Sequence, residues 1–257
     1  MIYAESHNRN KNTSLLLALW KRAKFAISMA YLFLWGFDGA AASTLDSCRE
    51  PYANKDYAAA VQCVRPFAEQ GNAAAQYLLG MHNMLGDGTP KDVEQGVRWL
   101  RQAADNGSRE AQRELGLMHL SGEVLPRDEA AAVKWFYSAA RMGEPRSQYQ
   151  MGEVYRLGIT KPVDLYEAAK WYRRGAKGGD QDAQFARGEM YRDGNGVPRD
   201  MVQAYVWFYI AAASMDRRHE IARDEMEKAL TPEQLGRAKE IITDLFFQIY
   251  PPLEECP

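Results

Sequence analysis

Cysteine and histidine are scarce in this sequence. It has three cysteines and four histidines in 257 residues, and no histidine pairs with Cys, Asp or Glu at the spacing of metal ligands. Three scattered cysteines exclude a small fold held together by a disulfide framework, and the histidine spacing argues against a structural zinc site. We therefore expect neither a metal site nor a cofactor.

An excess of positive charge is also lacking. The formal net charge is −2 at pH 7, with 32 basic and 34 acidic residues. Binding to nucleic acid calls for a basic face or stripe, so we expect no nucleic-acid partner. The composition, 46% hydrophobic and 26% charged, is instead typical of a well-packed globular protein.

The motifs of common hydrolases and nucleotide-binding enzymes are missing too. No serine has a lysine three places on, and there is no G-x-S-x-G elbow, P-loop or H-E-x-x-H. The segment DGNG at 193–196 resembles the start of a calcium loop but lacks the bidentate acid that such a loop needs at its twelfth position. We therefore predict a protein that is not an enzyme and has no catalytic residues.

Residues 1–42 differ in kind from the rest of the chain. Basic residues precede an apolar run over 25–37, and a stretch of small residues follows it. That order is the layout of a secretory signal peptide with cleavage after Ala42, and the run is too short to span a bilayer. An alternative joins residues 15–20 to the run as an uncleaved membrane anchor, at roughly 3 kcal/mol for each basic side chain buried between them. We expect a periplasmic or secreted protein, with anchoring in the inner membrane as the alternative.

Six residue types recur at a spacing of 36 residues, without an insertion, over four copies. Such agreement indicates an array of structural repeats. The columns are Gly80, Gly116, Gly152 and Gly188; Trp99, Trp135, Trp171 and Trp207; Gln76, Gln112, Gln148 and Gln184; Pro90, Pro126, Pro162 and Pro198; Asp92, Asp128, Asp164 and Asp200; and Ala104, Ala140, Ala176 and Ala212.

Each unit is predicted to contain two helices. In the first copy, a helix over 74–85 ends at Gly86, and a loop with a proline leads to a second helix over 93–105 that an aspartate caps. Glycine inside a helix costs about 1 kcal/mol against alanine, so its recurrence at Gly80 indicates another helix too close for a Cβ. The tryptophan is expected to fill the gap between adjacent units, which are stable only when stacked.

The two ends of the array are predicted to be caps. Residues 43–72 form an N-terminal cap that keeps the register of a second helix, with Cys63 in the tryptophan column. Four units follow over 73–216. Capping helices occupy 217–250, where TPEQ starting at Thr231 has the form of a capping box with proline at the first helical position. Residues 251–257 are a tail.

The unit AxQxxLGxxYxxGxGVPxDxxxAxxWxxxAAxxG resembles the Sel1-like repeat, a relative of the tetratricopeptide repeat. Its best copy, residues 183–214, reads AQFARGEMYRDGNGVPRDMVQAYVWFYIAAAS, and a spacing of 36 favours this family over the tetratricopeptide unit of about 34 residues. The resemblance covers about residues 74–216 and implies an exported bacterial protein with an all-α fold, an α-solenoid forming a right-handed superhelix. Copies two and three lack the second loop glycine, so their loop conformation stays open.

The resemblance also implies where a partner binds. In the tetratricopeptide fold the concave face comes from first-helix positions that avoid the core, and these carry over to twelve positions here. The predicted partner-binding residues are Tyr77, Met81, Met84, Arg113, Leu117, Leu120, Tyr149, Glu153, Arg156, Phe185, Glu189 and Arg192.

The two halves of this predicted face differ in chemistry. The first half is mostly apolar, which suits an amphipathic helix or peptide segment of a partner, and the second half is charged. The alternative for the charged half is ion pairs at i,i+3 that only decorate a solvated helix. The alternative for Met81, Met84, Leu117 and Leu120 is that a rotated helix packs them into the core.

We predict a scaffold that binds a segment of a protein partner on the concave face. An enzyme is the alternative of another class, because a cysteine-rich branch of secreted Sel1-like proteins has been linked to β-lactam binding and hydrolysis. That branch carries paired cysteines in each repeat, whereas units two to four of this chain have none. A structural role in the cell envelope is a third reading.

The cysteines lie near the ends of the chain. Cys48 and Cys63 flank the turn of the N-terminal cap, where an exported protein could oxidise them to a disulfide. Cys48 could instead accept a lipid, although Asp46 fits that signal poorly. Cys256, in the tail, is a candidate free thiol.

Overall fold

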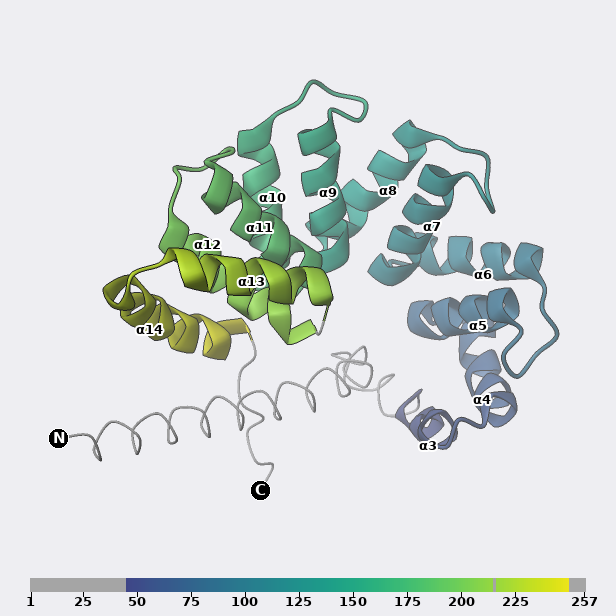
Figure 1. Ribbon diagram of the computed structural model, residues 1–257. Helices are drawn as coiled ribbons and strands as arrows, with labels where there is room; N and C mark the ends of the chain where they lie inside the picture. The colour runs from purple at the N-terminus through teal and green to yellow at the C-terminus, as the bar shows by residue number, and fades with distance from the viewer. Residues whose placement is uncertain (1–44, 215, 250–257) are drawn as a thin grey trace, which may run out of the picture.

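The computed structural model describes residues 45–214 and 216–249, and within them the chain forms twelve α-helices, two 3-10 helices and no strand. The helices follow one another in antiparallel pairs along an arc (Figure 1). The predicted all-α solenoid is therefore confirmed. Among these helices, none has both the length and the apolar character needed to cross a membrane. The predicted signal peptide or anchor at 1–42 and the tail at 251–257 with Cys256 lie outside the described residues.

Four helix pairs make up the array, between a cap at each end. The pairs are α5 (Ala73–Leu85) with α6 (Val93–Asp105), α7 (Arg109–Ser121) with α8 (Glu129–Arg141), α9 (Pro145–Leu157) with α10 (Leu165–Lys177), and α11 (Gln181–Asp193) with α12 (Met201–Ala211). Before them come η1 (Asp46–Cys48), α3 (Arg49–Ala53) and α4 (Tyr57–Glu69), and after them η2 (Ala212–Ser214), α13 (Arg217–Ala229) and α14 (Pro232–Ile249). The helix bounds predicted for the first unit differ by one residue at most.

The ends of the helices follow from local hydrogen bonds. Asp92 caps α6 by accepting a hydrogen bond of 2.8 Å from the backbone N–H of Gln95, and Gly86 ends α5 in the left-handed conformation with φ +85°. The other units repeat both features. The first helices are also capped, by residues that differ in type and so form no visible column: Asn72, Ser108, Glu144 and Asp180.

The glycine column lies where two helices of a unit touch. A Cβ added to Gly116 would come within 2.5 Å of the Phe136 ring, and one added to Gly188 within 2.6 Å of the Phe208 ring. The close approach predicted for this column is therefore present. The side chain that meets the glycine is the one after the tryptophan in sequence, while Trp171 itself is buried between units with Phe136 and Met151.

The glutamine column ties each unit to the helix before it. The Nε2 atom of Gln148 donates a hydrogen bond of 3.1 Å to the carbonyl of Ala140, and the other three glutamines bond the matching alanine at 3.0–3.2 Å. These alanines lie in the last turn of a second helix, where carbonyls lack their usual helical partners. The glutamine and alanine columns thus form one repeated link.

The loops of the units are not all alike. Gly88 and Gly196 adopt left-handed conformations with φ +72° and +71°. Thr160, at the same position of the third unit, has φ +61°, whereas Val124 of the second has no positive φ. The missing glycine therefore changes the loop of the second unit and leaves a β-branched residue in the left-handed region in the third.

Both ends of the array are covered. A disulfide joins Cys48 of η1 to Cys63 of α4, with 5.6 Å between the Cα atoms. At the other end, α13 and α14 both pack against α12. The Thr231 backbone N–H donates to Gln234 Oε1 at 2.9 Å and the Gln234 N–H to Thr231 Oγ1 at 3.3 Å, so the predicted capping box is present.

Candidate functional site

A groove of about 490 Å³ is lined by the first helices of the third and fourth units, α9 and α11. Its lining includes five of the six residues predicted for that half of the concave face: Tyr149, Glu153, Arg156, Phe185 and Glu189. Tyr172 of α10 and Arg218 of α13 also contribute to the wall. The lining of the groove therefore comes from α9, α10 and α11 and from α13 of the C-terminal cap.

Helical spacing brings these side chains together. Positions 149, 153 and 156 are four and three residues apart on α9, and 185 and 189 are four apart on α11, so each set lies on one helix face. The period of 36 makes Tyr149 equivalent to Phe185 and Glu153 equivalent to Glu189, and all four line the groove. A second groove of about 190 Å³ is lined by Leu120 of α7 and again by Tyr149 and Glu153, so the two grooves adjoin along α9.

The remaining apolar residues of the predicted face are half-buried. Tyr77, Met81 and Met84 pack against a buried cluster of α6 and α7, and Leu117 packs against the cluster around Phe136. Met84 lies so close to Gly96 that a Cβ there would overlap its side chain. These residues contribute to packing, and their role in partner binding stays a prediction.

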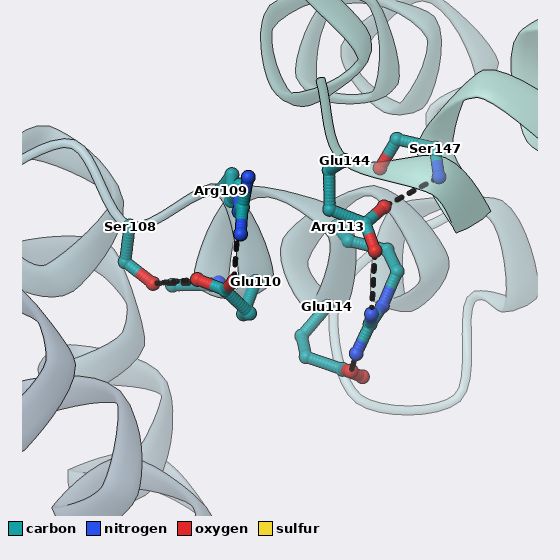
Figure 2. A network of polar contacts seen from close by, with 8 residues as sticks. Ser108, Arg109, Glu110, Arg113, Glu114, Glu144 and Ser147 are labelled. Carbon is teal, nitrogen blue, oxygen red and sulfur yellow. Dashed lines mark hydrogen bonds and ion pairs between the residues drawn. The ribbon is translucent and has the colours of Figure 1, made fainter. Parts of the chain in front are cut away.

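Arg113 takes part in a polar network between units (Figure 2). Its Nη1 atom lies 3.0 Å from Glu144 Oε1 and its Nη2 atom 2.6 Å from Glu114 Oε1, and only 11% of its side chain is exposed. Although burial lowers the pKa of Arg113, the hydrogen bond to Glu114 and the charges of both carboxylates raise it above its usual value. Glu144 also accepts a hydrogen bond from the Ser147 N–H and thereby caps α9. Arg113 thus links α7 to the start of α9.

Ion pairs shape the wall of the larger groove. Arg156 bonds both carboxylate oxygens of Glu153, at 2.9 and 2.5 Å, and the Tyr172 hydroxyl donates to the same carboxylate. Arg192 does not line the groove in this arrangement, but its Nη2 atom lies 3.6 Å from Glu189 Oε1. The Glu153–Arg156 pair and Glu189 are therefore part of the groove wall, and Arg192 is not.

Burial and neighbouring carboxylates raise the pKa values of two side chains in the groove, Tyr149 and Glu189. The pKa of Tyr149 is raised to about 12, mainly by burial and then by the charges of Glu153 and Asp182. The pKa of Glu189 is also raised, first by burial and then by Asp193, against the opposing effect of Arg192. Burial is the main cause of both shifts, and the nearby carboxylates add to it. Within 45–214 and 216–249, no three His, Cys, Asp or Glu side chains are grouped so that they could hold a metal ion.

The repeat units can be compared with a known family. The model of the Sel1 repeat matches residues 73–108, 109–144, 145–180 and 181–214, more than half of the chain. The chain belongs to the Sel1 repeat family. Proteins with Sel1 repeats generally mediate protein–protein interactions, and the scaffold is typically non-catalytic.

Solved structures with the same repeat are similar over much of this chain. A protective antigen of uropathogenic Escherichia coli strains, which displays an SLR fold, is 34% identical with a TM-score of 0.67, over 75% of this chain and 42% of that one. A Sel1 repeat protein from Oxalobacter formigenes is 32% identical with a TM-score of 0.62, over 68% and 49%. The matches thus span less than half of either relative.

An immunity protein from Pseudomonas aeruginosa shares the fold alone. It is 16% identical with a TM-score of 0.51, over 86% of this chain and 91% of that one. A comparison with curated proteins finds no match.

Helix α11 carries part of the groove, and the residue that caps it, Asp180, is expected to make the stability of the fold depend on pH. Asp180 accepts a hydrogen bond from the Ala183 N–H at 2.8 Å, and burial, helped by Asp182, raises its pKa to about 7. The folded state therefore holds the proton more tightly than the unfolded chain, where aspartate titrates near about 3.9. Stability contributed by this proton is complete below about pH 4 and is lost as pH rises through 7.

We expect Asp180→Asn to raise the melting temperature at pH 8 by a few degrees and to have little effect at pH 4. Asparagine keeps the cap, as Asn72 does for α5, and removes the buried charge. Thermal unfolding followed by circular dichroism at both pH values measures the change. Asp128→Asn, at the exposed cap of α8, is the matched control. An equal gain in both variants would contradict the role of Asp180.

Proposed function

We propose that this protein is a non-catalytic scaffold that holds a segment of a protein partner on the concave face of its repeats. The observation that carries the proposal is the groove of about 490 Å³ along α9 and α11, together with the smaller groove that adjoins it. Its lining comes from columns that vary between units, whereas the columns that repeat are used for packing and capping. Only the varying columns can distinguish one partner from another.

The proposal includes the place of action. We propose that the chain works after export, in the periplasm or outside the cell. The disulfide between Cys48 and Cys63 supports this, because such bonds persist in oxidising compartments.

Site-specific photo-crosslinking in cells tests the proposal. A benzophenone amino acid replaces Tyr149 in the groove, and in a matched control it replaces Tyr166, which is 64% exposed on α10. We expect a discrete adduct with one protein from position 149 and none from 166. Adducts of equal yield at both positions, or an adduct from 166 alone, would count against the concave face as the binding surface.

A further inference from the structure

Carboxylates outnumber guanidinium groups in the groove between α9 and α11. Its lining contains four carboxylates and two guanidinium groups, which are Glu153, Asp182, Glu189 and Asp193 against Arg156 and Arg218. An occupant with basic side chains would reduce this excess of negative charge.

Both guanidinium groups already have carboxylate partners. Arg156 bonds the two oxygens of Glu153, and Arg218 Nη2 lies 2.7 Å from Asp216 Oδ2. An anionic occupant would have to displace these partners before it could bond either arginine. The groove is therefore unfavourable for an acidic segment.

Of the two half-buried carboxylates in the groove, Glu153 and Glu189, Glu189 has the weaker pairing. Its neighbour Arg192 lies 3.6 Å away but makes two closer bonds to Asp193, at 2.7 and 2.9 Å. Glu189 is half-buried and lies near the charge of Glu153. An incoming cation can bond Glu189 without breaking a strong ion pair.

Aromatic rings lie beside this carboxylate. Asp182, Phe185 and Glu189 occupy one face of α11, and seven residues of helix separate the two carboxylates by roughly 10 Å along the axis. The Phe185 ring stacks on His219 at 4.6 Å and packs against Phe208 at 5.2 Å, which holds it in place. Aromatic rings attract a guanidinium or ammonium group that lies over them.

We propose that the groove takes a basic segment of the protein partner, in which an arginine or lysine side chain lies against Tyr149 and Phe185 and bonds Glu189. The inference rests on the proposed function and adds the chemistry of the occupant. The ring faces contribute attraction to the cation, and the half-buried carboxylate contributes a charge-assisted hydrogen bond.

Selection from a library of random dodecapeptides displayed on phage, with the full chain as bait, tests this inference. We expect the recovered peptides to be enriched in arginine and lysine. Their affinity for the Glu189→Gln variant should fall about tenfold, equivalent to about 1.4 kcal/mol. Glu94→Gln removes the same charge from a carboxylate that is 91% exposed on α6, and it should leave the affinity unchanged. Unchanged melting temperatures show that both variants fold.

The outcomes separate the chemistry of the occupant from the existence of the groove. Peptides without a basic bias that lose binding on Phe185→Leu would overturn the basic segment and leave the proposed scaffold standing. Equal loss of affinity in Glu189→Gln and Glu94→Gln would also overturn it, because the attraction would then be non-specific. If no peptide is recovered and Tyr149 gives no crosslink, both proposals fail.

Discussion

Replacing Arg113 by alanine is expected to lower the free energy of unfolding by about 3–5 kcal/mol, the usual effect of removing one partner from a buried ion pair. Glu144 would remain with only 6% of its side chain exposed and no guanidinium to balance its charge. It would also cap α9 without that support. Urea unfolding followed by tryptophan fluorescence measures the loss.

The first unit supplies a matched control for this prediction. Tyr77 and Ser108 occupy the positions of Arg113 and Glu144 one period earlier, and Ser108 caps α7 through the Ala111 N–H at 3.1 Å. The double variant Arg113→Tyr with Glu144→Ser transfers that pair and removes both charges. We expect it to recover most of the stability lost in the single variant. A double variant as unstable as Arg113→Ala would refute the ion pair as the cause.

Replacing Arg187 by leucine is expected to raise the free energy of unfolding by about 1–4 kcal/mol, the range found when packed apolar residues replace a buried ion pair. Arg187 stands in a column that otherwise holds Leu79, Leu115 and Met151. Only 9% of it is exposed, and none of the carboxylates in 45–214 and 216–249 forms an ion pair with it. Burial lowers its pKa, which reflects the cost of keeping the charge there.

Some attraction offsets this cost. The Arg187 guanidinium lies 4.9 Å from the Tyr191 ring centre and 5.2 Å from that of Trp207, and its Nη2 atom donates to the Tyr191 hydroxyl at 2.8 Å. Its Nε atom is buried without a hydrogen-bond partner in the described part of the chain. Denaturant unfolding of Arg187→Leu measures whether the cost of burying the charge exceeds the attraction from these contacts. The reciprocal variant, Leu115→Arg, is expected to be destabilising. A loss of stability in Arg187→Leu would show that ring stacking outweighs desolvation.

Much of the fold follows from residues whose effect on the backbone reaches only a few positions along the chain. Helix capping by aspartate, helix termination by glycine and the exclusion of helix before proline all depend on neighbouring residues alone. Their repetition every 36 residues therefore located both helices of each unit. The resemblance to the tetratricopeptide fold, rather than the spacing alone, implied that Tyr149, Glu153, Phe185 and Glu189 share a surface. The caps of the first helices escaped notice because Asn72, Ser108, Glu144 and Asp180 differ in type, although all sit 36 residues apart.

Contacts between units depended on the tertiary structure. The spacing of Met81 and Met84 is the same on an open face as in a core, and only the rotation of α5 against α6 places the Met84 side chain against Gly96. Arg113 meets Glu144 across 31 residues of chain, and Arg187 is buried between two rings. The sequence determined the helices, their order and their stacking, because those depend on local capping and on repetition. Only the packed array decided which varying side chains meet, because the relative rotation of neighbouring helices sets distances that spacing along one helix does not contain.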